Sequence, residues 1–273
     1  MAKKQKKSIQ LLEDKGWEIK SYSGADKIVQ GEFKEIFQQI TKVLLSFKIP
    51  LYEIMCEGGG KHPVNKRFSL LLDQILDKEV SFKSRIITTL NDETQVGSVD
   101  EALSHKVDFF YKGDEANLGL EIEWNSKVLA FERDIMNFRR LFFNASIGVG
   151  IIITRGESMD NKLLGISEKF FQSRIKKKNW VRSVNSIKTE LSKHEDCNGK
   201  PLKFKTFTDT QKKQIDKLII EGHAPSKAVA KNYFQNKWGG QTSHISSLEE
   251  RIKRGGFQGI PLLLIGIPDK VIN

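Results

Sequence analysis

The chain has 273 residues, 38% of them hydrophobic, which is enough to build the core of one large domain. Its longest apolar runs are far shorter than the ~20 residues that cross a bilayer, and two cysteines are too few for a disulfide framework. A net charge of +11 favours a polyanionic partner, with nucleic acid as the leading candidate. Because the basic N-terminus is followed by no apolar segment, residues 1–31 are expected to form a basic extension of a cytoplasmic protein.

Periodic apolar residues predict the elements of an α/β domain. Apolar steps of three and four residues indicate helices, and apolar or β-branched runs bounded by turn residues indicate strands. The expected elements, in chain order, are a helix over 33–47, a helix over 68–76, strands over 85–90, 106–111 and 118–124, a helix over 131–142, a strand over 147–154, a helix over 208–221 and a strand over 261–267.

We expect a single domain over residues 32–273, because no clean linker interrupts the chain. The stretch from about 222 to 259 is rich in Gly, Ser, Asn, Gln and Lys, and it is expected to be an irregular, DNA-contacting insertion before the last strand.

Three acids on the expected hairpin, which turns at residues 112–117, carry the functional prediction. If the two strands pair symmetrically about that turn, Asp108 lies opposite Glu121 and Lys106 lies opposite Glu123. Alternate side chains of a strand share a face, so Asp108, Glu121 and Glu123 would converge on one patch. The opposite face would be strongly apolar, with Val107, Phe109, Leu120, Ile122 and Trp124.

Carboxylates held this close repel one another, and a cation would offset the repulsion. A ligand set made only of oxygen atoms suits Mg²⁺, which also binds substrate phosphate. Taken alone, a Glu-x-Glu pair is more typical of a solvated sheet face. The apolar opposite face and the polar residues Asn125, Ser126 and Lys127, which follow the acids, favour a metal site.

Several segments together are similar to those of one known family: 57–60, 104–108, 120–127, 131–141, 148–156, 242–244, 255–256 and 261–267. Over roughly residues 57–267, the chain resembles the BglII/BstYI family of type II restriction endonucleases. The resemblance implies a PD-(D/E)XK nuclease core, which is an α/β fold with a central mixed sheet flanked by helices, and residues 48–156 are expected to hold the catalytic core. It also implies Mg²⁺-dependent, sequence-specific hydrolysis of double-stranded DNA that leaves 5′-phosphate ends.

By the same resemblance Asp108 and Glu121 are expected to bind the metal, and Glu123 stands where most of the superfamily has lysine. Glu123 would act as a general base or bind metal through water. A restriction–modification system further implies a cognate DNA methyltransferase. Cutting both strands of a palindrome requires two sites related by a two-fold axis, so a homodimer is expected.

Further residues are candidates for the site or for DNA contacts. Glu57, Asn125 and Lys127 are possible additions to the catalytic site. The expected DNA-contacting residues are Arg155, Lys237, Gln241, Thr242, Ser243 and His244, although an ordinary polar surface loop would have the same composition. A basic patch formed by residues 176–178 with Arg174 and Arg182 would either bind the DNA backbone or be a solvated helix face.

Two other functions remain open on the sequence. A DNA repair or junction-resolving nuclease would use the same core and the same acids. A non-catalytic nucleic-acid-binding protein would carry the acids only as surface residues.

Overall fold

The computed structural model describes residues 7–58, 62–89, 96–176, 179–239, 242–255 and 259–273. Within these residues, the centre of the molecule is a six-stranded mixed sheet in the order β1-β6-β5-β4-β3-β2. Its strands are β1 (Glu18–Tyr22), β2 (Asp77–Thr89), β3 (Val96–Lys112), β4 (Asn117–Glu123), β5 (Val149–Arg155) and β6 (Leu262–Ile267). The three central strands β4, β5 and β6 run parallel, and the outer pairs are antiparallel.

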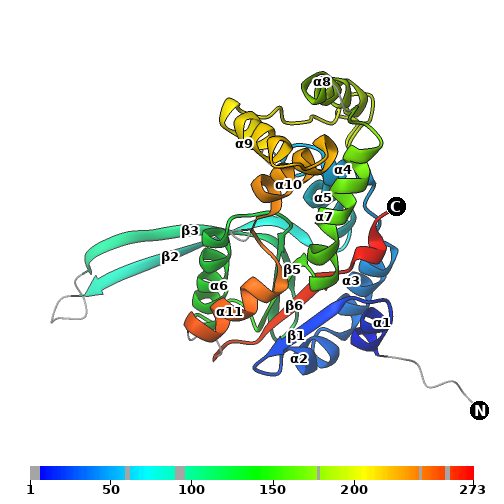
Figure 1. Cartoon of the computed structure of the whole chain (residues 1–273). Coiled ribbons are helices and arrows are strands. Elements are labelled where there is room, and N and C mark those ends of the chain that lie inside the picture. Colours follow the sequence, from blue (N-terminus) through cyan, green and yellow to red (C-terminus); the bar gives the residue numbers. More distant parts are fainter. Residues whose placement is uncertain (1–6, 59–61, 90–95, 177–178, 240–241, 256–258) are drawn as a thin grey trace, which may run out of the picture.

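Helices cover both faces of the sheet, which explains why every residue of β5 and β6 is buried. The helices are α1 (Ser8–Asp14), α2 (Ala25–Gly31), α3 (Lys34–Ser46), α4 (Leu51–Met55), α5 (Pro63–Leu72), α6 (Val128–Phe143), α7 (Glu157–Gln172), α8 (Trp180–Leu191), α9 (Asp209–Ile220), α10 (Pro225–Trp238) and α11 (Ile245–Gly255). Helices α6 and α11 pack on one face with a smaller core cluster, while the larger cluster fills the other face (Figure 1). This arrangement confirms the expected fold class.

Helix α6 crosses from β4 to β5 and lies close to the sheet, because two paired glycines leave room for it. Gly119 and Gly150 are partners in the parallel register. A Cβ atom at Gly119 would lie 2.8 Å from Cε1 of Phe138, and one at Gly150 would lie 2.9 Å from its Cδ2. The Phe138 ring therefore fills the space above both glycines, and this contact fixes the height of α6 over the acid-bearing strand.

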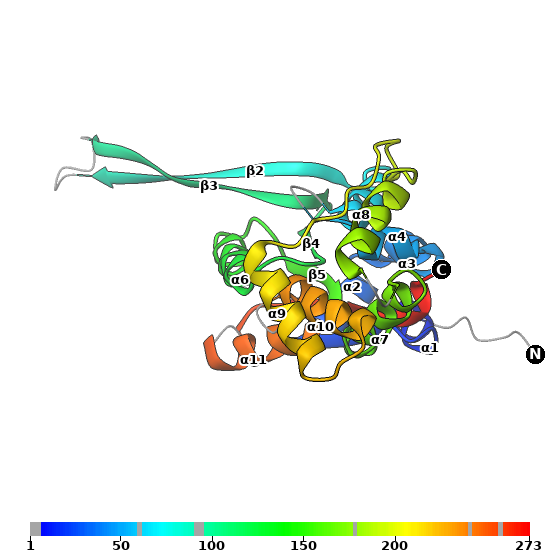
Figure 2. The same ribbon diagram turned by 45° about the horizontal axis from the view of Figure 1, so that its top comes forward.

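Strands β2 and β3 extend well beyond the sheet as a two-stranded ribbon. Figures 1 and 2 show it projecting from the body of the molecule in both views. The predicted strand over 85–90 is only the outer part of β2, and the predicted strand over 106–111 is only the inner end of β3. Periodicity over short windows could not show that the two strands pair along their length.

The predicted N-terminal extension is wrong for residues 8–31. These residues form α1, β1 and α2, and β1 pairs with β6 at the edge of the sheet. Leu12, Trp17, Ala25 and Val29 are buried in the main core. The apolar positions here are few and interrupted by charged residues, so they form no long periodic run. Residues 1–6 lie outside the described part of the chain.

The region expected to be irregular, 222–259, contains the helices α10 and α11 instead. Helix α10 buries residues on several sides, among them Ala228, Val229 and Tyr233, so its apolar residues mark no single stripe. Helix α8 had also been missed in a stretch that looked basic, although Trp180, Val184 and Ile187 are buried on one side of it. In the described part of the chain, no helix is long and apolar enough to cross a membrane.

Candidate active site

The β3–β4 hairpin has the register that symmetric pairing predicts. The paired residues run from Lys112 and Asn117 to Phe109 and Leu120. At the next pair, Asp108 and Glu121, backbone-to-side-chain hydrogen bonds replace the backbone-to-backbone hydrogen bonds of the ladder. The Asp108 N–H donates to Oε2 of Glu121 at 3.3 Å, and the Ile122 N–H donates to Oδ2 of Asp108 at 3.1 Å. Asp108 and Glu121 therefore lie side by side where the two strands begin to separate.

Lys106 does not take the position opposite Glu123 that the symmetric register predicts. It pairs with Ser81 of β2, and its ammonium lies 3.4 Å from the carboxylate of Glu79. Val107 also departs from the prediction, because it joins the core cluster under α6 while Phe109 joins the cluster on the other face. The strict alternation assumed for this strand fails between these two residues, next to Asp108.

A fourth acid, Asp134 of α6, lies over the strand acids. Its side chain is 1% exposed, and it interacts with Glu123 by charge and by a side-chain hydrogen bond. Asp134 stands one turn before Phe138, so the packing of Phe138 on the glycines places Asp134 above the next part of β4. Sequence reasoning missed it, although an aspartate on the apolar stripe of a predicted helix is itself a signal, because a charge there needs a reason to be buried.

Burial and repulsion by neighbouring acids favour the protonated forms of Glu121 and Glu123. The side chains of Glu121 and Glu123 are 4% and 6% exposed. Burial, followed by the charge of Asp108, raises the pKa of Glu121 to about 11. Burial, followed by the charge of Asp134, raises the pKa of Glu123 to about 9. Without a cation, Glu121 and Glu123 thus carry protons at neutral pH.

A hard divalent cation fits the chemistry of this cluster. Its donors are carboxylate oxygens, and a bound cation would offset the repulsion that raises both pKa values. Among the described residues, no three His, Cys, Asp or Glu side chains already form a metal cluster. Asp108 and Glu121 instead bind each other's strand through backbone N–H groups, and these bonds would have to be exchanged for metal ligation.

Two hydroxyl groups fix the backbone at Glu123. The carbonyl of Glu123 accepts hydrogen bonds from Thr154 Oγ1 of β5 at 2.7 Å and from Ser243 Oγ at 3.2 Å. Ser243 also accepts from the Ser126 N–H at 2.9 Å, and its own N–H donates to the Ser126 carbonyl. The sequence predicted Ser243 as a DNA contact. It is completely buried, however, and it holds the end of β4 in place.

Arg155 holds the segment that carries Ser243. Its side chain is 0% exposed, and its Nε donates to the Ser243 carbonyl at 3.0 Å. Its Nη2 donates to Thr242 Oγ1 at 2.8 Å, and Nη1 forms an ion pair with Asp160 of α7 at 2.7 Å. Burial lowers the pKa of Arg155 to about 10. A guanidinium with no exposed surface does not reach DNA, so the predicted DNA contact is replaced by a positioning role.

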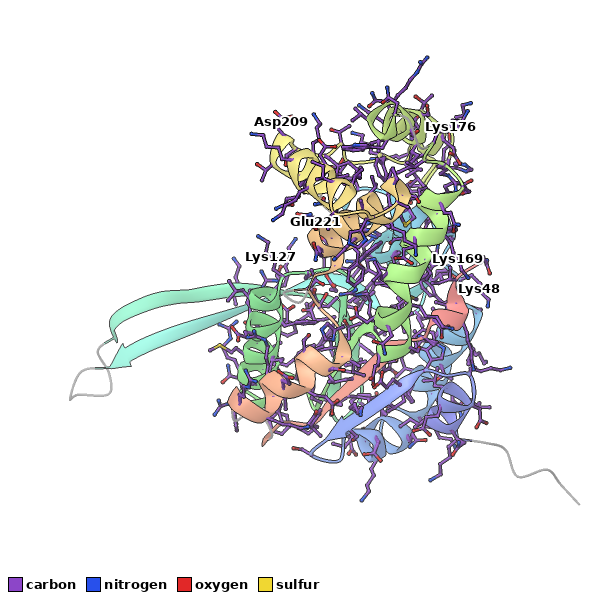
Figure 3. All side chains as sticks on the ribbon, in the orientation of Figure 1. Lys48, Lys127, Lys169, Lys176, Asp209 and Glu221 are labelled. Carbon is purple, nitrogen blue, oxygen red and sulfur yellow. The ribbon has the colours of Figure 1, made fainter. Side chains whose placement is uncertain are left out.

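A cavity of about 480 Å³ opens next to the acid-bearing strand. Five residues proposed from sequence for catalysis or DNA contact line it together: Glu57, Asn125, Lys127, Lys237 and Thr242. They come from four separate stretches of the chain. Lys127, the residue before α6, is exposed and lines this cavity, and Figure 3 labels its position. Residues directly after the acids, Asn125 and Lys127, thus line the same cavity as Lys237 and Thr242.

The sequence model of the family described as Restriction endonuclease BglII/BglIII matches residues 17–267. The chain belongs to this family. It is therefore a restriction-endonuclease-type DNA hydrolase with a PD-(D/E)XK core, as the resemblance in the sequence implied. Comparison with curated proteins found no match.

Two other expected DNA contacts, Lys237 and His244, have different surroundings in this BglII/BglIII-family chain. The ammonium of Lys237 turns inward and donates to the carbonyl groups of Ile54 and Cys56 and to Tyr233 Oη. Burial lowers the pKa of Lys237 to about 7. The ring of His244 is half-buried and accepts from the Ser247 N–H, which caps the first turn of α11. Gln241 lies outside the described residues.

One member of the basic patch expected near residue 176, Arg174, is paired within the protein, whereas Lys176 and Arg182 are exposed. Arg174 forms a bidentate ion pair with Glu190 and lies over the ring of Phe170 at 4.1 Å. Residues 177 and 178 are outside the described part. Arg174 is therefore less available to a DNA backbone than its sequence position suggests.

Proposed function

We propose that this BglII/BglIII-family protein is a Mg²⁺-dependent type II restriction endonuclease that hydrolyses double-stranded DNA at a specific sequence and leaves 5′-phosphate ends. The buried acid cluster beside an open, lysine-containing cavity supports this proposal most directly. Nonspecific surface acids would be solvated, whereas these are buried at an energetic cost that metal binding would offset.

In this proposal Asp108 and Glu121 hold the cation, since they lie side by side across two strands. Bound Mg²⁺ would supply a more acidic water and stabilise the charge on the leaving oxygen. Asp134 adds negative charge from α6 and thereby strengthens the preference of the cluster for a divalent cation.

Glu123 takes the role of proton acceptor for the attacking water. Its pKa of about 9 means that it carries a proton in the metal-free protein; a bound cation would lower this pKa and free the carboxylate to accept a proton, a role that the lysine carried here by most relatives of this fold would not fill. Thr154 and Ser243 anchor its backbone, and this anchoring keeps the carboxyl group at a fixed distance from its neighbours.

A second copy of the chain is expected to complete the enzyme, because a palindromic site is cut in both strands by two sites. The outer side of α6 supports an interface there. Leu129, Met136 and Phe143 are spaced seven residues apart and are 76%, 59% and 65% exposed. A DNA methyltransferase of matching specificity is the proposed cellular partner, because host DNA needs protection from the nuclease.

Incubation of the protein with plasmid DNA and Mg²⁺ tests the proposal. Discrete fragments with one sequence at every end are expected, and Asp108→Asn and Glu121→Gln should each abolish cleavage while DNA binding in Ca²⁺ remains. A repair or junction-resolving enzyme would cut without a fixed fragment pattern. Full activity in either variant would overturn the assignment of the acids.

A further inference from the structure

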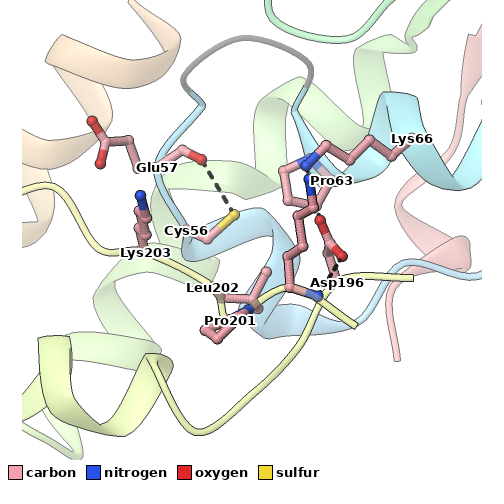
Figure 4. A pocket seen from close by; sticks show the side chains of 9 residues that line it. Cys56, Glu57, Pro63, Lys66, Asp196, Pro201, Leu202 and Lys203 are labelled. Atoms are coloured by element: carbon pink, nitrogen blue, oxygen red, sulfur yellow. Dashed lines mark hydrogen bonds and ion pairs between the residues drawn. The ribbon is translucent and has the colours of Figure 1, made fainter. Parts of the chain in front are cut away.

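Two adjoining cavities form a groove lined by lysines. The first has a volume of about 400 Å³, and Lys66 and Lys203 enter it from opposite sides (Figure 4). The second is the cavity of about 480 Å³ beside the active site. Both have Cys56 and Glu57 in their walls, so they meet there. We call this space the lysine groove and define it by Lys66, Lys127, Lys200, Lys203 and Lys205.

Most of the positive charge in the lysine groove is available to a ligand. Lys66 is paired with Asp196 at 2.9 Å, and that aspartate also accepts from the backbone N–H groups of Asn198 and Lys200. The other four lysines are exposed, and none has an ion-pair partner within the described residues. The carboxylate of Glu57 is the remaining negative group in the walls. The groove is thus built for an anion.

The backbone that carries three of these lysines is held firmly. In the segment 200–207, Lys203 and Lys205 are exposed while Leu202 and Phe204 are buried. The Leu202 N–H donates to the His194 carbonyl at 2.8 Å, and the Lys203 carbonyl accepts from the Glu57 N–H. The Phe204 ring stacks on Tyr233 with the two centroids 5.5 Å apart. Because the segment is already ordered, a ligand would not have to order it on binding.

The spacing and position of the lysines identify the ligand. Alternate side chains of an extended segment lie ~6.6 Å apart, which is comparable to the distance between neighbouring phosphates of one nucleic-acid strand. The groove also ends at Asn125 and Lys127, directly after the acid-bearing strand. A polymer of phosphates that entered along residues 200–205 would be led to the catalytic acids.

We propose that the lysine groove binds the phosphodiester backbone of the DNA substrate on one side of the scissile bond. This inference rests on the proposed function, because it assigns the path of that same substrate. It differs from the sequence-based expectation, which placed backbone binding near residues 174–182 and in the 237–244 region. Here Lys200, Lys203 and Lys205 provide affinity independent of base sequence.

The double variant Lys203→Ala/Lys205→Ala tests the groove. Binding of a fluorescent duplex is measured in Ca²⁺ over a range of salt concentrations, with Lys34→Ala/Lys42→Ala on α3 as the charge-matched control. Each lost phosphate contact should lower the slope of log K against log salt by ~0.9, so a decrease of about 1.8 is expected for the double variant. Affinity at low salt should fall at least about tenfold, while the control retains the wild-type slope.

An unchanged slope and affinity in the folded double variant would overturn the proposal. A circular dichroism melt establishes folding, and Lys203→Gln/Lys205→Gln provides a second variant that keeps the polar surface. The wild-type cleavage assay separates the two proposals. If the wild type binds DNA through these lysines but does not cut it, the binding role of the lysine groove is supported and the nuclease proposal is contradicted. If the wild type cuts DNA and the double variant binds DNA normally, only the proposed binding role of the lysine groove is contradicted.

Discussion

At the scale of single residues, the site combines groups that repel each other with groups that hold them together. Glu121 and Glu123 are buried in their acidic surroundings, and their pKa values rise to about 11 and 9 as a result. Thr154 and Ser243 then anchor the strand that carries them. Such a cluster is a source of instability until a cation binds.

Glu121→Gln should therefore stabilise the metal-free protein and remove the effect of Mg²⁺. A raised carboxyl pKa contributes stability that is complete below the unfolded value of 4.5 and is lost as pH rises toward about 11. At pH 8 in EDTA the variant should thus melt above the wild type, by about 2–4 °C for each kcal/mol gained. Mg²⁺ should raise the wild-type melting temperature and leave that of the variant unchanged.

Scanning calorimetry with and without Mg²⁺ measures this difference. Glu115→Gln, at an exposed position of the β3–β4 turn, is the matched control and should behave as the wild type does. Equal shifts with Mg²⁺ in wild type and Glu121→Gln would show that Glu121 does not bind the metal.

Lys237 should make stability depend on pH in the opposite direction. Its pKa falls from 10.5 to about 7 because the ammonium is buried, so the folded protein releases a proton that the unfolded chain keeps. The stability contribution is complete above pH 10.5 and is lost as pH falls toward 7. Between these values the wild type should gain stability relative to Lys237→Met as pH rises.

Thermal melts of both proteins across this range test the sign. The exposed Lys231 on the same helix gives the control variant Lys231→Met, whose difference from the wild type should not change with pH. A constant difference for Lys237→Met as well would mean that Lys237 is not buried as described.

At the scale of elements, the contact of α6 with the sheet fixes the active site. Phe138 packs on Gly119 and Gly150, and the turn before it carries Asp134. A substitution at either glycine would therefore move Asp134 in the acid cluster as well as disturb the packing of the core.

Gly150→Ala should lower stability by about 1–3 kcal/mol, because its methyl group would meet the Phe138 ring at 2.9–3.0 Å and force α6 outward. Cleavage activity should fall more than stability alone explains, because Asp134 moves with the helix. Urea unfolding and a cleavage assay measure the two effects. Gly165→Ala in α7 is the control: its Cβ meets nothing within 4 Å, and it should stabilise the helix by about 1 kcal/mol.

Much of this architecture was predictable from sequence, and the failures have physical causes. The hairpin register around Asp108 and Glu121 followed from strand alternation and turn residues, and the capped helix α9 followed from Thr208 and the apolar spacing after it. The roles of Arg155 and Ser243 could not be found in this way, because their burial depends on contacts between residues about 90 positions apart. Asp134 belongs to the same class, since helix packing alone brings it to Glu123.

At the scale of the whole molecule, α6 has two functions in the proposed enzyme. Its inner side covers the acid cluster, and its outer side presents Leu129, Met136 and Phe143 to solvent. An exposed apolar stripe with seven-residue spacing is typical of helices that pack against another helix. Each active site would then be separated from the interface by the width of one helix.

Met136→Glu should convert a dimer into a monomer, because a charge in the centre of the stripe would be buried without a partner. Sedimentation of the wild type and the variant at micromolar concentration measures the masses. Ile220→Glu, at an 86% exposed position of α9, is the control and should leave the mass unchanged. A wild type that sediments as a monomer at all concentrations would contradict the proposed interface.

The pairing of β1 with β6 joins residues 18–22 to residues 262–266. During synthesis on the ribosome, β1 therefore cannot pair until residues 262–266, about 240 positions later in the chain, have emerged. Ser243, which anchors the backbone at Glu123, also comes late. We therefore expect folding to be slow, as it is for topologies rich in distant contacts. A nascent nuclease would thus carry its acids without a finished site until residues 243 and 262–266 had been translated.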